Sequence, residues 1–492
     1  MERLTFNIGS SRGGPVVVSG RGQQQPARHA PATRIVSQAV AAIRERYDWD
    51  YVWMLTFTAL LFFRPQDQIP GLDLLHMSEL TAIAGLAAMA VRRMSAGRTI
   101  AHVNVEVVAI VALGAVIVLT VPFSIWPGGA AHVFTDIYVK IILIFALMMS
   151  TITTPRRLRQ MTWVMIVASG YIGARAVFDY VRGVNLVEGD RVRGAVGGMF
   201  ENPNDLALNL VTFLAPTLFI ILHDRKPSRR LFASALAVAM LAAIVCTKSR
   251  SGFLGLLAMG AVVMYYTAKV NPAAVGVALV AGLMALPVMP DSFWNRMDSI
   301  VNAEEDESGS RAARLRLIDQ GVQVFIENPI TGIGAGQFKN YNAPDTVEKW
   351  RVTHNVWLQV AAELGIGGLL TFGFLVARAY SASFAAARML RRTRRRAGPP
   401  SQRGAEDPDL GLTDDERRTL DLNTKGMLAA MVGWTVCSLF ASVAFNWTLY
   451  YVLALAVAGR EVLSARRAAV KAAEAAAPIA KVPASRLIRV HA

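Results

Sequence analysis

Long apolar runs recur along most of the chain, and they are continuous instead of alternating with polar residues. A run of about 17–25 apolar residues is long enough to cross a bilayer as an α-helix. Lipid offers no partners to backbone polar groups, so helices and closed barrels are the possible spans, and continuous runs favour helices. The pattern predicts about twelve spans, at 49–64, 76–91, 104–123, 134–151, 160–180, 205–222, 231–247, 251–268, 273–290, 355–377, 426–443 and 447–463.

The basic residues between these runs predict an orientation. Lysine and arginine gather in alternate connections, for example at 92–98, 156–159 and 225–230, whereas the connection "PFSIWPGGAAHV" has neither. Basic residues remain preferentially on the cytoplasmic side. The expected protein is therefore all-α and polytopic, with both termini in the cytoplasm.

The two ends of the chain differ from the rest in composition. Residues 1–48 are rich in Gly, Pro, Gln and Arg, which predicts a disordered basic cytoplasmic tail. Residues 466–492 are predicted to form a second cytoplasmic tail.

Two long segments separate predicted spans, one on each side of the membrane. The external segment, 291–354, contains apolar residues at helical spacing and is expected to fold as a loop with amphipathic helices; these residues are Leu315, Ile318, Val322 and Phe325. The segment 378–425 is first basic and then acidic, and we expect a flexible cytoplasmic loop there.

Composition agrees with a membrane protein, since 53% of residues are hydrophobic and 17% are charged. The net charge of +16 could indicate nucleic-acid binding, but its distribution between spans favours topology, and no nucleic-acid partner is expected. Cys246 and Cys437 fall within predicted spans, which argues against a structural disulfide. The sequence shows no metal-ligand cluster, Walker loop or serine-nucleophile motif, so no metal or cofactor is expected.

External arginines are the first candidate chemistry, because they oppose the topological bias. In "EGDRVRGAVGGMFENPND", Arg191 and Arg193 precede a glycine-rich turn. Asn202 belongs to the turn before the next helix, and Asn204 is the expected N-cap. Arg193 and the helix N-terminus could hold an anion that the glycines allow to approach the backbone. A capped helix with two solvated arginines is the alternative.

A second group lies in "TKSRSG", between two closely spaced spans. The planar guanidinium of Arg250 suits phosphate oxygens, while simple snorkelling of Lys248 and Arg250 to the interface is the alternative. Arg311 begins a third group, in which exposure on an amphipathic helix is the simpler explanation.

Charged residues within two predicted spans form possible pairs four residues apart. These are Asp136 with Lys140 and Arg175 with Asp179. Ionisable residues in a membrane are functional candidates, so Lys140 is included as a possible supporting cation.

The segment "THNVWLQVAAELGIGG" contains the candidate acid–base group. Asn355, Gln359 and Glu363 share one helix face, which must contact protein or a water-filled cavity because lipid exposure is costly; we expect a cavity wall. His354 stands at its external end, and histidine can accept a proton near neutral pH. A capping or hydrogen-bonded histidine is the alternative. The glycines at 365, 367 and 368 predict close helix packing.

Together these motifs resemble the bacterial O-antigen ligase and polymerase superfamily. The matching stretches, in order, are "RVRGAVGGMFENPND", "TKSRSG", "RLIDQGVQVFIENPITGIGAGQF" and "THNVWLQVAAELGIGG". The resemblance covers roughly residues 50–465 and implies a helical inner-membrane glycosyltransferase related to the C-type architecture. Such enzymes take a glycan from undecaprenyl diphosphate on the periplasmic side.

The resemblance also implies roles for individual residues. Arg193 and Arg250 would bind the diphosphate, with Arg191, Lys140 and Arg311 as further candidates, and His354 would be essential. Ligases transfer the glycan to lipid A-core, and polymerases transfer it to another lipid-linked repeat. A ligase is the leading hypothesis, a polymerase the close alternative, and a transporter of lipid-linked sugars the alternative from another class.

Overall fold

The computed structural model describes residues 48–67, 69, 71–187, 190–195, 199–285, 287, 293–294, 310–341, 352–396 and 410–476. Nearly all of its regular structure is helical, and the one sheet has two short strands. The predicted N-terminal tail and most of the C-terminal tail lie outside the described residues. The main helices are α2 (Trp49–Phe63), α3 (Met77–Ser95), α4 (Val105–Thr120), α5 (Pro127–His132), α6 (Val139–Thr151), α7 (Pro155–Val181), α8 (Pro203–His223), α9 (Pro227–Thr247), α10 (Arg250–Ala268), α11 (Pro272–Ala285), α13 (Ser310–Glu327), α14 (Val356–Arg396), α15 (Asp414–Ser438) and α16 (Trp447–Ala476).

Each of the twelve predicted ranges overlaps helical structure among the described residues. Eight helical segments among the described residues are long and apolar enough to cross a membrane. Of the other predicted spans, α2 and α11 have 15 and 14 residues. Helix α3 carries charged residues at both ends, and α15 carries them in its N-terminal part. The chain is therefore an all-α membrane protein.

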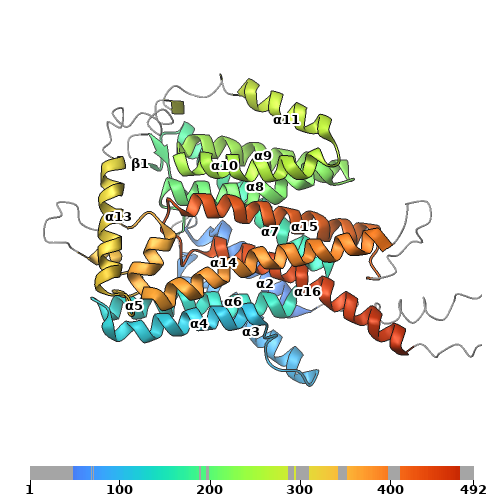
Figure 1. The fold of residues 1–492 in the computed structure, drawn as a ribbon, viewed down its shortest axis with the longest axis horizontal. Helices are drawn as coiled ribbons and strands as arrows, with labels where there is room; N and C mark the ends of the chain where they lie inside the picture. The colour runs from blue at the N-terminus through green and yellow to red at the C-terminus, as the bar shows by residue number, and fades with distance from the viewer. Residues whose placement is uncertain are drawn as a thin grey trace, which may run out of the picture.

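Figure 1 shows most of the long helices running side by side along one axis, with α13 lying across one end of the bundle. Helix α8 is central: its side chains are buried along most of its length, and it packs against α9, α10 and α15. Proline stands near the first position of α7, α8 and α9. There its fixed φ favours the helix and its missing N–H leaves no internal bond unmade.

The segment predicted as a flexible loop at 378–425 is largely helical. Helix α14 continues to Arg396, and α15 begins at Asp414 with a capping box between Thr413 and Glu416. Arg378 donates a 2.7 Å hydrogen bond to Glu106, which is fully buried in α4. A buried carboxylate requires such a partner, so the helix is held in place beyond the predicted span.

The predicted amphipathic helix, α13, faces the protein with a different side from the one predicted. Leu315, Ile318 and Val322 are 59%, 42% and 42% exposed. The buried face instead contains Leu317, Gly321 and Val324. A Cβ on Gly321 would lie 2.6 Å from Leu358, so the absence of a side chain there selects the face that packs against α14.

The two predicted intrahelical ion pairs have different outcomes. Arg175 and Asp179 form the expected pair, at 3.0 Å. Asp136 instead pairs with His132 at 2.9 Å, and Lys140 with Glu79 of α3 at 3.1 Å. Asp136 lies in a π-helical turn, Val133–Tyr138, where the side-chain spacing of a regular α-helix does not hold.

Candidate functional site

A short hairpin between α7 and α8 positions the first candidate cations. Strands β1 (Leu186–Val187) and β2 (Arg191–Val192) are antiparallel. Arg191 is 2% exposed, and its guanidinium donates to the Thr247 carbonyl at 3.0 Å and to Asn204 Oδ1 at 2.9 Å. Arg193 follows the end of the strand and its side chain is exposed. Arg191 thus joins the hairpin to α8 and α9, whereas Arg193 is open to a ligand.

The two candidate asparagines have exchanged their expected roles. Asn202 is the N-cap of α8, and its side chain accepts from the Asn204 N–H at 2.8 Å. Asn204, predicted to be the cap, is buried two residues further on and accepts from Arg191 and from Ser249 Oγ. Ser249 in turn caps α10. A single amide oxygen therefore ties the hairpin to two helix N-termini.

Lys248 and Arg250 stand on either side of that cap. Lys248 is buried, has a left-handed backbone with φ of 48°, and pairs with Asp190 of the hairpin. Arg250 is the first residue of α10 and is half-buried. Sequence reasoning identified these cations but missed Asp190 and Ser249, because their partners are far away in the chain.

His354 lies in the segment that leads into α14. Its backbone is also left-handed, with φ of 48°, and its side chain is half-buried. Such a conformation is unusual outside glycine and is found preferentially at functional sites. The preceding residue, Thr353, forms a 2.9 Å hydroxyl hydrogen bond with Ser442, beyond the end of α15.

The polar stripe that follows His354 was expected to form a cavity wall. Its described hydrogen bonds are instead with other groups of the protein. Asn355 caps α14 by accepting from the N–H groups of Trp357 and Leu358. Gln359 is buried and accepts from the Ala444 N–H at 3.2 Å. Glu363 is also buried and accepts from the Gly336 N–H at 2.8 Å.

Glu363 belongs to a junction that holds the segment after α13 on α14. Helix α14 is interrupted at Gly365, where φ is 64°. The interruption leaves the carbonyls of Ala362 and Glu363 available, and the N–H groups of Ile333 and Gly334 donate to them at 3.0 and 2.9 Å. Gly365 therefore allows the break in the helix, in addition to the close packing predicted for it.

The hairpin, the start of α10 and the segment that contains His354 lie at one end of the bundle. The segment after α15 connects them: Asn446 donates to the Met199 carbonyl at 3.4 Å, beside the hairpin, while Ser442 bonds Thr353. The thiol of Cys437 donates to the Ser251 carbonyl at 3.4 Å. Figure 1 shows the hairpin, labelled β1, and α13 at this same end. The arrangement brings the exposed Arg193, the half-buried Arg250 and the half-buried His354 to one end of the bundle.

The other predicted members either lie apart from this framework or fall outside the described residues. Lys140 pairs with α3 and is 42% exposed. The side chain of Arg311, in the first turn of α13, lies outside the described residues, as do Gly197 and Gly198. Gly194 packs against Phe200, to which a Cβ would come within 2.5 Å; its small size serves that contact.

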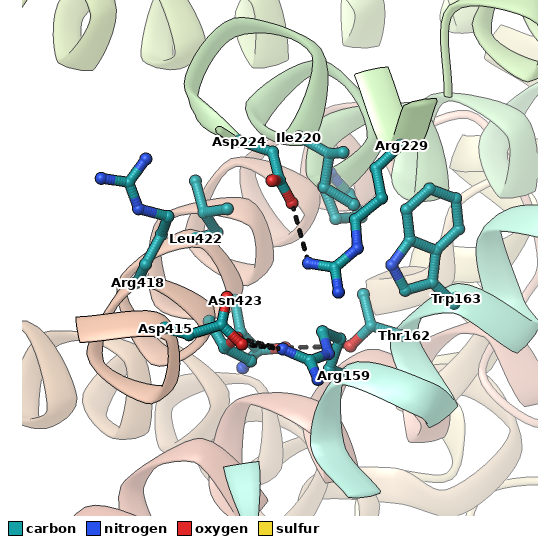
Figure 2. A pocket seen from close by; sticks show the side chains of 12 residues that line it. Arg159, Thr162, Trp163, Ile220, Asp224, Arg229, Asp415, Arg418, Leu422 and Asn423 are labelled. Atoms are coloured by element: carbon teal, nitrogen blue, oxygen red, sulfur yellow. Dashed lines mark hydrogen bonds and ion pairs between the residues drawn. The ribbon is translucent and has the colours of Figure 1, made fainter. Parts of the chain in front are cut away.

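A separate cavity lies at the opposite end of α7, α8, α9 and α15 (Figure 2). Two of its three arginines are paired with aspartates: Arg159 bonds Asp415 at 2.6 Å, and Arg229 bonds Asp224 at 3.4 Å. Its volume of about 30 Å³ accommodates a water molecule but not a sugar. The ion pairs in Figure 2 join helices instead of forming a substrate site.

In the part of the chain that the structure describes, no three His, Cys, Asp or Glu side chains are grouped to hold a metal ion.

Comparison with known families gives one match. Residues 235–373 match the family described as O-antigen ligase. The matched range includes Lys248, Arg250, α13 and the segment from His354 to Glu363, and it ends before α15. No curated protein matches the chain. The match confirms the resemblance to the O-antigen ligase and polymerase superfamily predicted from the motifs.

Proposed function

We propose that this member of the O-antigen ligase and polymerase superfamily is a ligase-type glycosyltransferase of the bacterial inner membrane. It moves a glycan from undecaprenyl diphosphate to an acceptor hydroxyl at the periplasmic face, with lipid A-core or another glycan as the acceptor. The supporting observation is the gathering of Arg193, Arg250 and His354 at one end of the bundle, around the buried Arg191–Asn204–Ser249 framework.

The donor side of the reaction requires stabilisation of negative charge. When the bond between the anomeric carbon and the diphosphate oxygen breaks, its electron pair stays on the diphosphate. Arg193 and Arg250 would hold those oxygens. Fixed donors aimed at developing charge contribute about 10²–10³ in rate each. The buried Arg191 and Lys248 are positioning residues, because their side chains already bind Asn204 and Asp190.

The acceptor side requires removal of a proton. The hydroxyl oxygen attacks the anomeric carbon from the face opposite the diphosphate, which inverts its configuration. A neutral His354 ring nitrogen would take the hydroxyl proton, a contribution of about 10²–10⁴ in rate. The proton then passes to water.

The test replaces His354 by alanine and, separately, by glycine. Glycine adopts a left-handed backbone without strain, so it removes the side chain while preserving the conformation at φ of 48°. Both variants should insert normally and lose transfer of purified lipid-linked glycan by about 10²–10⁴. Transfer retained by His354→Gly would refute a role for the imidazole.

Ligase and polymerase activities are separated by the surface glycans of a deletion strain. Loss of a ligase leaves full-length chains on the lipid carrier, whereas loss of a polymerase leaves single repeats. Full-length chains on the carrier are the expected result. Single repeats would assign the polymerase reaction to the same donor site.

A further inference from the structure

A large groove lies on the outer surface of the bundle between α10, α14 and α15, and it is separate from the candidate site. Its volume is about 800 Å³, within the range of about 300–1,000 Å³ that small-molecule sites occupy. Aliphatic side chains of α10 and α15 form one part of its wall, and an aromatic and basic part completes it. That second part consists of Tyr265, Tyr266, Tyr380, Phe384, Arg388 and Arg391.

The continuation of α14 beyond its predicted span creates this groove. Tyr380 is fixed against α15, since its hydroxyl donates to the Met431 carbonyl at 3.0 Å and lies 2.8 Å from Thr435 Oγ1. Its ring therefore forms a fixed part of the wall. Phe384 and Arg388 follow at intervals of four residues on the same helix, and both are exposed.

The charge at one end of the groove is positive. Arg388 and Arg391 line it, and Lys269 Nζ lies 3.7 Å from the centre of the Tyr265 ring. None of the groove's described lining residues is acidic. The groove thus contrasts with the cavity of Figure 2, in which aspartates pair with two of the three arginines.

The basic end of the groove lies at the depth in the membrane at which lipid headgroups are found. Tyr265 lies 15 positions after Arg250 on α10, so the two are about 22 Å apart along the helix axis. With Arg250 near one membrane surface, the basic end approaches the other, across a hydrocarbon core about 30 Å thick. Tyrosine, lysine and arginine are the side chains that lie at this boundary.

We propose that this groove binds an anionic phospholipid of the cytoplasmic leaflet, with its phosphate at Arg388 and Arg391 and an acyl chain along α10 and α15. Basic pockets between helices on the cytoplasmic side are suited to such headgroups. The apolar wall favours a lipid over a free anion. The lipid site does not depend on the transfer reaction proposed above.

The test is native mass spectrometry of the full chain after reconstitution with equal amounts of phosphatidylcholine and phosphatidylglycerol. The wild-type chain should retain phosphatidylglycerol in preference to phosphatidylcholine. The double variant Arg388→Gln/Arg391→Gln should lower that retention at least about tenfold, because two charge-assisted contacts are lost. A matched control, Arg467→Gln/Lys471→Gln, removes two exposed charges from α16 and should leave retention unchanged.

A second variant tests the apolar wall. Ala261 is exposed and lines the groove, so Ala261→Trp should fill it and also reduce retention. Equal retention of both lipids, or equal loss in the control, would overturn the proposal. So would displacement of the lipid by inorganic phosphate, which would indicate a free-anion site, or by undecaprenyl phosphate, which would indicate a site for the donor's chain.

Discussion

Arg191 and Arg193 lie two residues apart but have opposite surroundings, so their substitutions should have different effects. Arg193 is exposed, and Arg193→Ala should slow transfer by about 10²–10³ without lowering thermal stability. Arg191 is buried with two hydrogen bonds. Arg191→Ala removes a buried donor from the Thr247 carbonyl and leaves Asn204 Oδ1 with Ser249 as its remaining donor. The loss should cost about 1–3 kcal/mol and lower the unfolding temperature as well as transfer.

Arg182 provides the control for these two variants. It is exposed beyond the end of α7, near the same hairpin. Arg182→Ala should change neither transfer nor the unfolding temperature. If Arg182→Ala lost as much transfer activity as Arg193→Ala, then general positive charge, and not a specific diphosphate contact, would explain the effect.

At the scale of the element, two glycines of α14 provide a matched pair of variants that test the helix break at Gly365. A Cβ on Gly365 would lie 2.5 Å from the Ile330 carbonyl oxygen, and its φ is 64°. Gly365→Ala should therefore destabilise the junction by at least about 1–3 kcal/mol and lower transfer by loosening the external loop. A Cβ on Gly367 would meet Val116 at 3.8 Å, so Gly367→Ala should be neutral in both thermal unfolding and transfer.

The ion pair of Arg159 with Asp415 joins α7 to α15 and predicts a pH dependence. Burial alone would raise the pKa of Asp415, but the hydrogen bond and charge of Arg159 lower it below its usual value of 3.8. The resulting stabilisation is present above pH 3.8 and is lost as pH falls through the lower folded-state pKa.

Asp415→Asn removes this contribution. Because the Asp415 side chain is 57% exposed, the effect should be at most about 1 kcal/mol. Thermal unfolding followed against pH should show a small difference from wild type that is constant between pH 5 and 8 and disappears on acidification. A difference that grows as pH falls would contradict this assignment.

The positions of the helices could be predicted from sequence because a long apolar run by itself indicates a membrane-spanning helix, whatever that helix packs against. Local sequence patterns gave wrong predictions where a residue's role depends on partners far away in the chain. The Gly321 contact with Leu358 decides which face of α13 is buried, and Arg191 and Ser249 turn Asn204 from a cap into a bridge. The external cations could be proposed as candidates because their charge opposed the topological pattern, and His354 because it stands at the end of a polar helix stripe, whereas Asp190 had no such signal.

At the scale of the whole molecule, the distribution of sites predicts which residues face each compartment. Helix α8 has 21 residues, so its ends are about 30 Å apart, which matches the hydrocarbon core of a bilayer. The candidate site surrounds its first residues, and the paired charges of Figure 2 surround its last. The two ends should therefore lie in different compartments.

Two exposed positions test this arrangement with a membrane-impermeant thiol reagent applied to spheroplasts. Val184 is near the hairpin, and Ser228 begins α9 at the opposite end. Val184→Cys should be labelled in intact spheroplasts, and Ser228→Cys only after permeabilisation. The wild-type chain supplies the background, since Cys437 is buried and Cys246 is half-buried. The reverse pattern would place Arg193 and His354 in the cytoplasm, where a periplasmic glycan acceptor could not reach them.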